Sequence, residues 1–265
     1  SNHPSACEDF NTLNFGGRRE DGTTPYRLGD QDLSLFFGQS SFSQYVVTRA
    51  SNAVVVDPEV DLTLLGPLGC GIQTGSGTVL NRLKPVVGES LVVFGCGAVG
   101  LSAIMAAKLT GCSQIIAVDI HASRLALARE LGATHQINGK EQDAVAVIKQ
   151  ITGKGAHYAV ETTGVSAIVL QAVHAVKPLG TVAIVGFTGD ITLNVQNDLM
   201  AEGKSLVGVI EGDAVPALFI PLLVQLYKQG KFPIDKLIAR YPLADINQAF
   251  ADSASGKVIK PVVVM

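Results

Sequence analysis

The segment VVFGCGAVG, residues 92–100, constrains the fold of this chain more than any other stretch. Gly95, Gly97 and Gly100 form the pattern G-x-G-x-x-G where a β-branched run gives way to an amphipathic stretch. In such a turn the first glycine permits a tight bend, the second lets the backbone approach a pyrophosphate, and the third lets a helix pack on a strand. The segment therefore predicts a dinucleotide-binding unit of one strand, one glycine turn and one helix.

Strand-like and helix-like stretches alternate downstream of this unit. Strand-like runs start near residues 91, 115, 134, 157 and 181, and a helical stretch follows each of the first four. This alternation is typical of a parallel sheet with crossover helices, so we expect an α/β protein with a doubly wound parallel Rossmann sheet. Four glycines are expected to end helices: Gly111, Gly132, Gly153 and Gly180.

An acidic residue follows the glycine turn at the distance typical of a dinucleotide site. Asp119 ends the next strand-like run, about two dozen residues after Gly95. A carboxylate there can accept hydrogen bonds from both ribose hydroxyls and would repel a 2′-phosphate, so NAD is favoured over NADP. The alternative is an ordinary acid that caps the next helix. Arg124, one turn into that helix, can reach the adenosine side or be solvated, and Cys96 is interpreted as a small filler.

Composition and charge exclude several functional classes. The 265 residues are 47% hydrophobic and 16% charged, which suits a globular protein of enzyme size. The net charge is −3 and there is no run of Lys or Arg, so neither nucleic acid nor an anionic membrane is an expected partner. Glycine or proline interrupts the two most apolar segments, 91–109 and 215–227, so no transmembrane helix is predicted. The first ten residues do not resemble a signal peptide.

The cysteines indicate a reducing compartment. Cys7, Cys70, Cys96 and Cys112 form neither a C-x-x-C pair nor a dense framework, so a disulfide-rich secreted domain is not expected. The expected location is the cytoplasm. Judged on its own motif, GPLGCGIQTGSG, Cys70 is either a buried structural cysteine or a zinc ligand, and the residues leave both interpretations open.

The two ends of the chain differ from the middle. Residues 1–70 are mostly polar and glycine-rich, with two strand-like runs inside residues 41–60. Residues 215–265 offer a helix, a strand-like run, a short helix and a last strand. We expect both ends to form one discontinuous domain, with the nucleotide-binding domain, residues 71–214, inserted between them.

Several longer segments carry a resemblance to a known family. Residues 66–77, 83–111 and 250–264 resemble the zinc-dependent medium-chain alcohol dehydrogenases, and the similarity covers essentially the whole chain. The segments LNFGGRREDGT, FFGQSSFSQY and QLYKQGKFP look like the aryl-alcohol (benzyl-alcohol) dehydrogenase branch, although glutathione-dependent formaldehyde dehydrogenases share much of this character. The resemblance implies a Rossmann sheet inserted in a discontinuous, mainly β, GroES-like catalytic domain. It also implies NAD-dependent oxidation of a primary, aromatic alcohol to the aldehyde by zinc-assisted hydride transfer, in a homodimer or homotetramer.

The same resemblance assigns site residues. Cys70 would be a ligand of the catalytic zinc, and Cys7 would be the last of four cysteines that hold a structural zinc. Thr74 would lie near the nicotinamide, with a packing role equally open, and apolar side chains of FFGQSS would shape the substrate pocket. The NAD-binding residues would be Gly95, Gly97, Ala98, Val99, Gly100, Asp119, Arg124, Thr162, Val185, Phe187 and Lys260.

The chain also departs from the pattern of this family. The Cys-x-[Ser/Thr/His] pair, the Gly-His-Glu segment and three closely spaced cysteines of the family's first third do not occur. A catalytic zinc needs three protein ligands and a structural zinc needs four, so one thiolate completes neither site. We therefore interpret the sequence as the C-terminal two-thirds of such a dehydrogenase. The alternatives are a catalytically inactive NAD-binding module and a zinc-independent reductase of the same superfamily.

Overall fold

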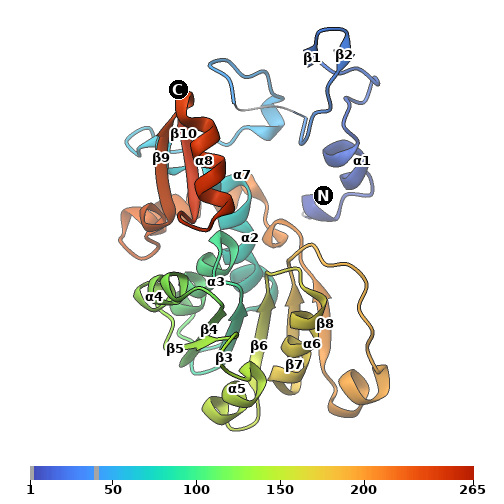
Figure 1. Cartoon of the computed structure of the whole chain (residues 1–265), viewed down its shortest axis with the longest axis vertical. Coiled ribbons are helices and arrows are strands. Elements are labelled where there is room, and N and C mark those ends of the chain that lie inside the picture. The colour runs from blue at the N-terminus through green and yellow to red at the C-terminus, as the bar shows by residue number, and fades with distance from the viewer. Residues whose placement is uncertain (1–2, 39–41) are drawn as a thin grey trace.

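The computed structural model describes residues 3–38 and 42–265, and a six-stranded parallel sheet forms its lower half in Figure 1. The strands lie in the order β5-β4-β3-β6-β7-β8, so the chain runs outward in one direction from β3 and then in the other from β6. This order is that of a doubly wound Rossmann sheet, and it confirms the predicted α/β fold. The strands are β3 (Ser90–Phe94), β4 (Gln114–Asp119), β5 (His135–Asn138), β6 (Ala156–Glu161), β7 (Val176–Ile184) and β8 (Ser205–Gly208).

Helices cover both faces of this sheet. Leu91 and Val93 of β3 pack in one core cluster with residues of α3 and α4, whereas Val92 and Phe94 pack in a second cluster with residues of α5 and α6. Successive side chains of a strand point to opposite faces, so an uninterrupted apolar run requires cover on both sides. The four crossover helices are α3 (Ala98–Leu109), α4 (Ala122–Leu131), α5 (Ala144–Thr152) and α6 (Ser166–Ala175).

Three of the four glycines expected to end helices do so. Gly111, Gly132 and Gly153 follow α3, α4 and α5 with φ of 77°, 130° and 84°. The prediction for Gly180 is wrong, because α6 ends at Ala175 and Gly180 lies inside β7. The pairing of β6 with β7 shifts its register here, and a Cβ on Gly180 would lie 2.8 Å from the carbonyl oxygen of Lys177. The glycine thus allows an irregularity in a strand.

The N-terminal part of the chain buries little. It contains α1 (Phe10–Phe15) and the two-residue strands β1 (Arg27–Leu28) and β2 (Gln31–Asp32), and none of residues 3–34 is buried. The strands predicted within residues 41–60 are not observed in the described part, 42–60. Val47 and Val55 are 81% and 90% exposed there, and no neighbouring strand in the described chain pairs with this segment. A β-branched run without a partner strand does not form a stable strand.

The C-terminal part contains α7 (Pro216–Lys228), β9 (Ile238–Pro242), α8 (Ile246–Ala254) and β10 (Lys260–Val264), with β9 and β10 parallel. Ion pairs connect it to the N-terminal part: Lys228 lies 2.5 Å from Asp57, and Arg240 lies 2.7 Å from Asp61. These contacts agree with a domain built from both ends, and its boundaries stay a prediction. Among the helices within the described ranges, none combines the length and the apolar character needed to span a bilayer.

Candidate functional site

The glycine turn between β3 and α3 is built by close backbone contacts. Gly95 has φ of 92°, and a Cβ there would lie 2.6 Å from Thr162 Oγ1. A Cβ on Gly100 would lie 1.8 Å from the carbonyl oxygen of Gly95, because α3 begins directly against the turn. Both positions therefore require glycine, one for its left-handed backbone and one for the close packing.

Gly97 fits a different purpose. It is the residue before α3, its φ is −78°, and a Cβ there would meet no described atom within 4 Å. The packing of the chain itself therefore gives no reason for a glycine at this position. The open space lies at the N-terminal end of a twelve-residue helix, where free N–H groups and the helix dipole favour an anion. The turn thus fits the pyrophosphate of a dinucleotide.

Asp119 lies at the end of the neighbouring strand β4 and is 8% exposed. Its Oδ2 accepts a hydrogen bond from Cys96 N (2.6 Å), and its Oδ1 accepts from Ile120 N (2.7 Å) and His121 N (2.9 Å). A carboxylate offers about four acceptor positions, so one remains for a ribose hydroxyl. Asp119 therefore orders the glycine turn and the approach to α4. Burial strongly raises the pKa of the Cys96 thiol, which agrees with its interpretation as a filler.

The other predicted nucleotide residues lie on several elements. Thr162 Oγ1 donates to Phe94 O (2.8 Å) and Gly95 O (3.1 Å), which places it against the glycine turn. Val185 N donates to the carbonyl oxygen of Glu161 (2.9 Å) just after β7. Phe187 is 94% exposed, and its ring meets that of Phe15 edge to face at 6.5 Å.

Two basic residues complete the predicted set. Arg124, in α4, places its guanidinium beside Gly256, and its buried Nε has no hydrogen-bond partner among the residues that the structure describes. Lys260 is the first residue of β10, and its positive charge partly offsets the burial that raises the pKa of the Cys70 thiol. The C-terminal part therefore contributes charge to this edge of the sheet.

Cys70 directly precedes the short buried helix α2 (Gly71–Gly77). A Cβ on Gly75 would lie 1.9 Å from Val99 O, and one on Gly71 would lie 3.5 Å from Val99 Cγ2 and 3.8 Å from Ala98 Cβ. These glycines let α2 touch the first turn of α3, so Cys70 stands beside the glycine turn. The residue is exposed, yet burial by surrounding atoms raises its pKa, and the charge of Glu211 raises it further.

The described residues do not complete a zinc site. Within 3–38 and 42–265, no three or more His, Cys, Asp or Glu side chains gather as metal ligands. Cys7 is exposed beside the short 3-10 turn Pro4–Ala6, and Cys70 stands at the start of α2. A zinc site requires at least three protein ligands, so these donors do not fit a complete one. Of the segment FFGQSS, Gln39, Ser40 and Ser41 lie outside the described residues.

Two acidic residues at this edge of the sheet were missed by sequence reasoning. Glu161 ends β6, is fully buried, and accepts hydrogen bonds from Thr163 N (2.6 Å), the Thr163 hydroxyl and Gly164 N (3.2 Å). The sequence could have identified Glu161, because this acid ends a strand-like run and is followed by Thr-Thr-Gly. Glu211 follows β8 and accepts from Gln73 Nε2 (2.9 Å). Its signal was an acid-Gly-acid turn after the last strand-like run.

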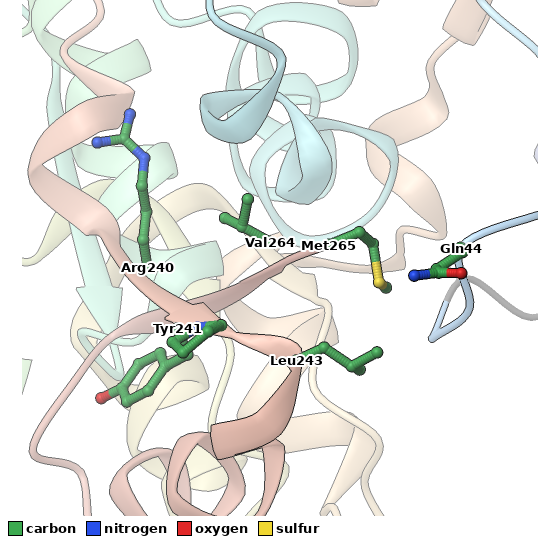
Figure 2. A pocket seen from close by; sticks show the side chains of 7 residues that line it. Gln44, Arg240, Tyr241, Leu243, Val264 and Met265 are labelled. Carbon is green, nitrogen blue, oxygen red and sulfur yellow. The ribbon is translucent and has the colours of Figure 1, made fainter.

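A separate groove lies between the C-terminal strands β9 and β10 and the N-terminal segment. Figure 2 shows its lining side chains, with Arg240 and Tyr241 from β9, Val264 and Met265 from the end of β10, and Gln44 opposite them. Its volume is about 410 Å³. The residues that line this groove differ from all the predicted site residues, so the groove is separate from the glycine turn.

Comparison with known proteins shows similarity along the chain. A family model described as zinc-binding dehydrogenase matches residues 98–228. Geraniol dehydrogenase of Castellaniella defragrans is 43% identical over 270 residues, which cover 99% of this chain and 72% of that protein. The solved structure of an alcohol dehydrogenase zinc-binding domain protein from Burkholderia ambifaria has a TM-score of 0.94 and 49% identity, covering 100% of this chain and 72% of that one. For benzyl alcohol dehydrogenase from Acinetobacter calcoaceticus the TM-score is 0.91 at 48% identity, over 98% and 72%.

Proposed function

Because this chain belongs to the zinc-binding dehydrogenase family, we propose that it binds NAD and oxidises a primary, aromatic alcohol to the aldehyde. The observation that carries the proposal is the space at Gly97, which no described side chain fills, in front of the N-terminus of α3. The names of its relatives, geraniol dehydrogenase and benzyl alcohol dehydrogenase, support an alcohol as substrate.

The chain's own residues supply the binding surface for this reaction. The backbone of Gly97, Ala98 and Val99 would hold the pyrophosphate at the start of α3, and the remaining acceptor position of Asp119 would bind a ribose hydroxyl. Arg124 would lie on the adenosine side. Bound NAD would supply the hydride acceptor.

The opposite end of the cofactor would lie where β6 and β7 end. Thr162, held by the backbone of the glycine turn, would border the nicotinamide together with Val185 and Phe187. Lys260 would be near the pyrophosphate. The positions of Thr162, Val185 and Phe187 follow from the shared edge at which parallel strands end in a doubly wound sheet.

We propose Cys70 as a thiolate ligand of a catalytic zinc and Cys7 as a ligand of a structural zinc. The described residues do not complete either ligand set, so no step of the reaction is assigned to zinc. The same observation favours one alternative, an NAD-binding module without turnover. Homodimeric or homotetrameric assembly, a cytoplasmic location, and the absence of nucleic-acid and membrane partners belong to the proposal too, the last supported by the net charge of −3.

Calorimetric titration of the chain with NAD and with NADP tests the proposal, followed by zinc analysis and an assay with benzyl alcohol. We expect NAD to bind at least tenfold more tightly than NADP, because Asp119 would repel a 2′-phosphate. Absence of NAD binding would refute the proposal. Binding of NAD without zinc and without turnover would identify the inactive module instead.

A further inference from the structure

The turn that follows β8 has an unusual backbone. Its three residues are all left-handed, with φ of 51° at Glu211, 67° at Gly212 and 49° at Asp213. This conformation favours glycine, so it is strained at the two acidic residues. Strained segments persist where the surrounding structure holds them, and they gather at functional sites. Glu211 and Asp213 can therefore keep this backbone conformation only if contacts with neighbouring residues hold it in place.

The helical segment after Cys70 holds this turn from one side. Asn81 Nδ2 donates to Gly212 O (3.0 Å), and Arg82 lies 3.4 Å from the Asp213 carboxylate. A Cβ on Gly212 would lie 2.4 Å from Gln73 O, and one on Gly77 would lie 2.4 Å from Gly212 O. The backbone of the turn is therefore in direct contact with α2.

Glu211 connects the turn to the backbone around Cys70. Its Oε2 accepts from Gln73 Nε2 (2.9 Å) and lies 3.4 Å from Thr74 Oγ1, whose single proton it shares with the closer Cys70 O. Both donors also bind carbonyl groups on either side of Cys70: Gln73 Nε2 donates to Gly69 O (3.0 Å), and Thr74 Oγ1 donates to Cys70 O (2.8 Å). Gln73 is 2% exposed and Thr74 is 9% exposed, so burial keeps both side chains in place. One carboxylate thus braces both side chains that hold the Cys70 backbone.

The Glu211 carboxylate also determines which way the Gln73 amide points. The amide nitrogen faces two acceptors, Gly69 O and Glu211 Oε2, while Oε1 has no hydrogen-bond partner in the part of the chain that the structure describes. A reversed amide would place its oxygen against two other acceptor oxygens, because an ionised carboxylate only accepts. The hydrogen bond from Gln73 Nε2 to Glu211 Oε2 therefore fixes the amide in this orientation, although it leaves the buried Oε1 without a partner, which costs free energy.

The Glu211 carboxylate also lies close to the main chain of Cys70. Its Oε2 is 3.4 Å from Thr74 Oγ1, which is itself 2.8 Å from Cys70 O. The strained turn therefore brings a carboxylate to the residue that carries the thiol.

We propose that Glu211 is a positioning residue for Cys70, which braces the start of α2 through Gln73 and Thr74 and places a negative charge beside the thiol. The inference rests on the proposed function, since it concerns the thiol proposed as a zinc ligand. Its test requires neither NAD nor turnover, so it can fail while the proposed function stands, and the NAD titration can fail while this inference stands.

Alkylation of the whole 265-residue chain, with a chelator present, tests the charge. Rates for iodoacetate and iodoacetamide are measured at Cys70 by peptide mass spectrometry, with the half-buried Cys112, beyond the far end of α3, as a reference in the same sample. Both reagents attack the same thiolate, so the ratio of the two rates reports the charge that the anionic reagent meets. Glu211→Gln should raise the ratio of the iodoacetate rate to the iodoacetamide rate at Cys70 about threefold or more, because it removes one negative charge from the surroundings of Cys70.

Asp213→Asn is the matched control, because it removes a charge from the same turn and asparagine tolerates left-handed backbone. It should leave the ratio at Cys70 unchanged, and both variants should leave the ratio at Cys112 unchanged. An unchanged ratio at Cys70 in Glu211→Gln, or an equal rise in Asp213→Asn, would overturn the proposal.

Amide hydrogen exchange tests the bracing. The Thr74 amide donates to Cys70 O (2.9 Å), so its exchange reports the opening of the first turn of α2. Glu211→Ala should speed this exchange about tenfold, and Glu211→Gln should restore it, because a glutamine oxygen still accepts the Gln73 proton. Wild-type exchange in Glu211→Ala would overturn the bracing role. If Glu211→Ala does not fold, the alkylation ratio at Cys70 in Glu211→Gln still supports or overturns the proposal.

Discussion

Replacing Gly97 by alanine separates binding of a dinucleotide from stability of the fold. The backbone at Gly97 has φ of −78° and ψ of −170°, which alanine adopts without strain, and an added Cβ meets no described atom within 4 Å. The folded chain therefore tolerates the methyl group. Alanine reduces the conformational freedom of the unfolded chain, which is worth about 0.4–1 kcal/mol, but Gly97 is the N-cap of α3, where glycine is preferred to alanine by a similar amount. The two effects offset each other, so Tm should stay within about 2 °C of the wild-type value.

Affinity for NAD should fall although stability hardly changes. The methyl group would occupy the space at the N-terminus of α3 that the pyrophosphate needs, so its closest approach to the backbone N–H groups is lost. We expect Kd for NAD to rise at least tenfold, which corresponds to about 1.4 kcal/mol. Calorimetric titration gives Kd, and a thermal melt without ligand gives Tm.

Gly208→Ala is the matched control for this experiment. Gly208 is exposed at the end of the edge strand β8, its φ is not left-handed, and a Cβ there also meets no described atom within 4 Å. This variant should keep the wild-type Kd. Wild-type affinity in Gly97→Ala, or a fall of several degrees in its Tm, would refute the reasoning, because either result means that the space at Gly97 is not reserved for a ligand.

Three further predictions concern stability. In Gly100→Ala the new Cβ would lie 1.8 Å from Gly95 O, so the free energy of unfolding should fall by the upper part of the roughly 1–3 kcal/mol that overpacking costs. The denaturant midpoint should fall with it, and an unchanged midpoint would contradict the close packing. Glu161→Gln should lose about 1–3 kcal/mol, since an amide offers fewer acceptors to the three donors at this fully buried side chain, and a thermal melt would show it as a fall in Tm that an exposed Glu59→Gln lacks. Burial, with the charge of Lys177, lowers the pKa of His157 below its ordinary value of 6.5, while Glu89 opposes this. The unfolded chain then binds more protons, so wild type should lose stability as pH falls through about 6.5, as followed by urea unfolding, and His157→Asn should lose less.

Local sequence patterns predicted most of the nucleotide-binding domain. The alternation of strand-like and helical runs identified β3 to β7 and the four crossover helices, because periods of two and 3.6 residues reflect which side chains must be buried. Gly95 and Gly100 were predicted from spacing alone, and the structure shows why: Gly95 has a left-handed backbone against the Thr162 side chain, and Gly100 lies against the backbone of Gly95. Gly111, Gly132 and Gly153 followed from the same local logic.

Predictions failed where a residue depends on a distant partner. Gly180 has the local context of a helix end, yet the register shift between β6 and β7 decides its role. The valine-rich runs of residues 42–60 have the composition of strands, but a strand forms only beside another strand, and none pairs with them in the described chain. Neither fact is encoded in the neighbouring residues.

Some features of the candidate site could likewise be predicted from the sequence, and others could not. By itself the sequence determined that a glycine turn begins a Rossmann unit, that an acid ends the next strand, and that Cys70 precedes a glycine-rich segment, because all three depend on short-range spacing. Only the tertiary structure decided that Glu211 meets Gln73, 138 residues earlier, and that α2 lies directly on α3. Such contacts arise when the sheet folds and brings the ends of its strands to one edge, and the spacing of residues along the chain carries no record of that meeting.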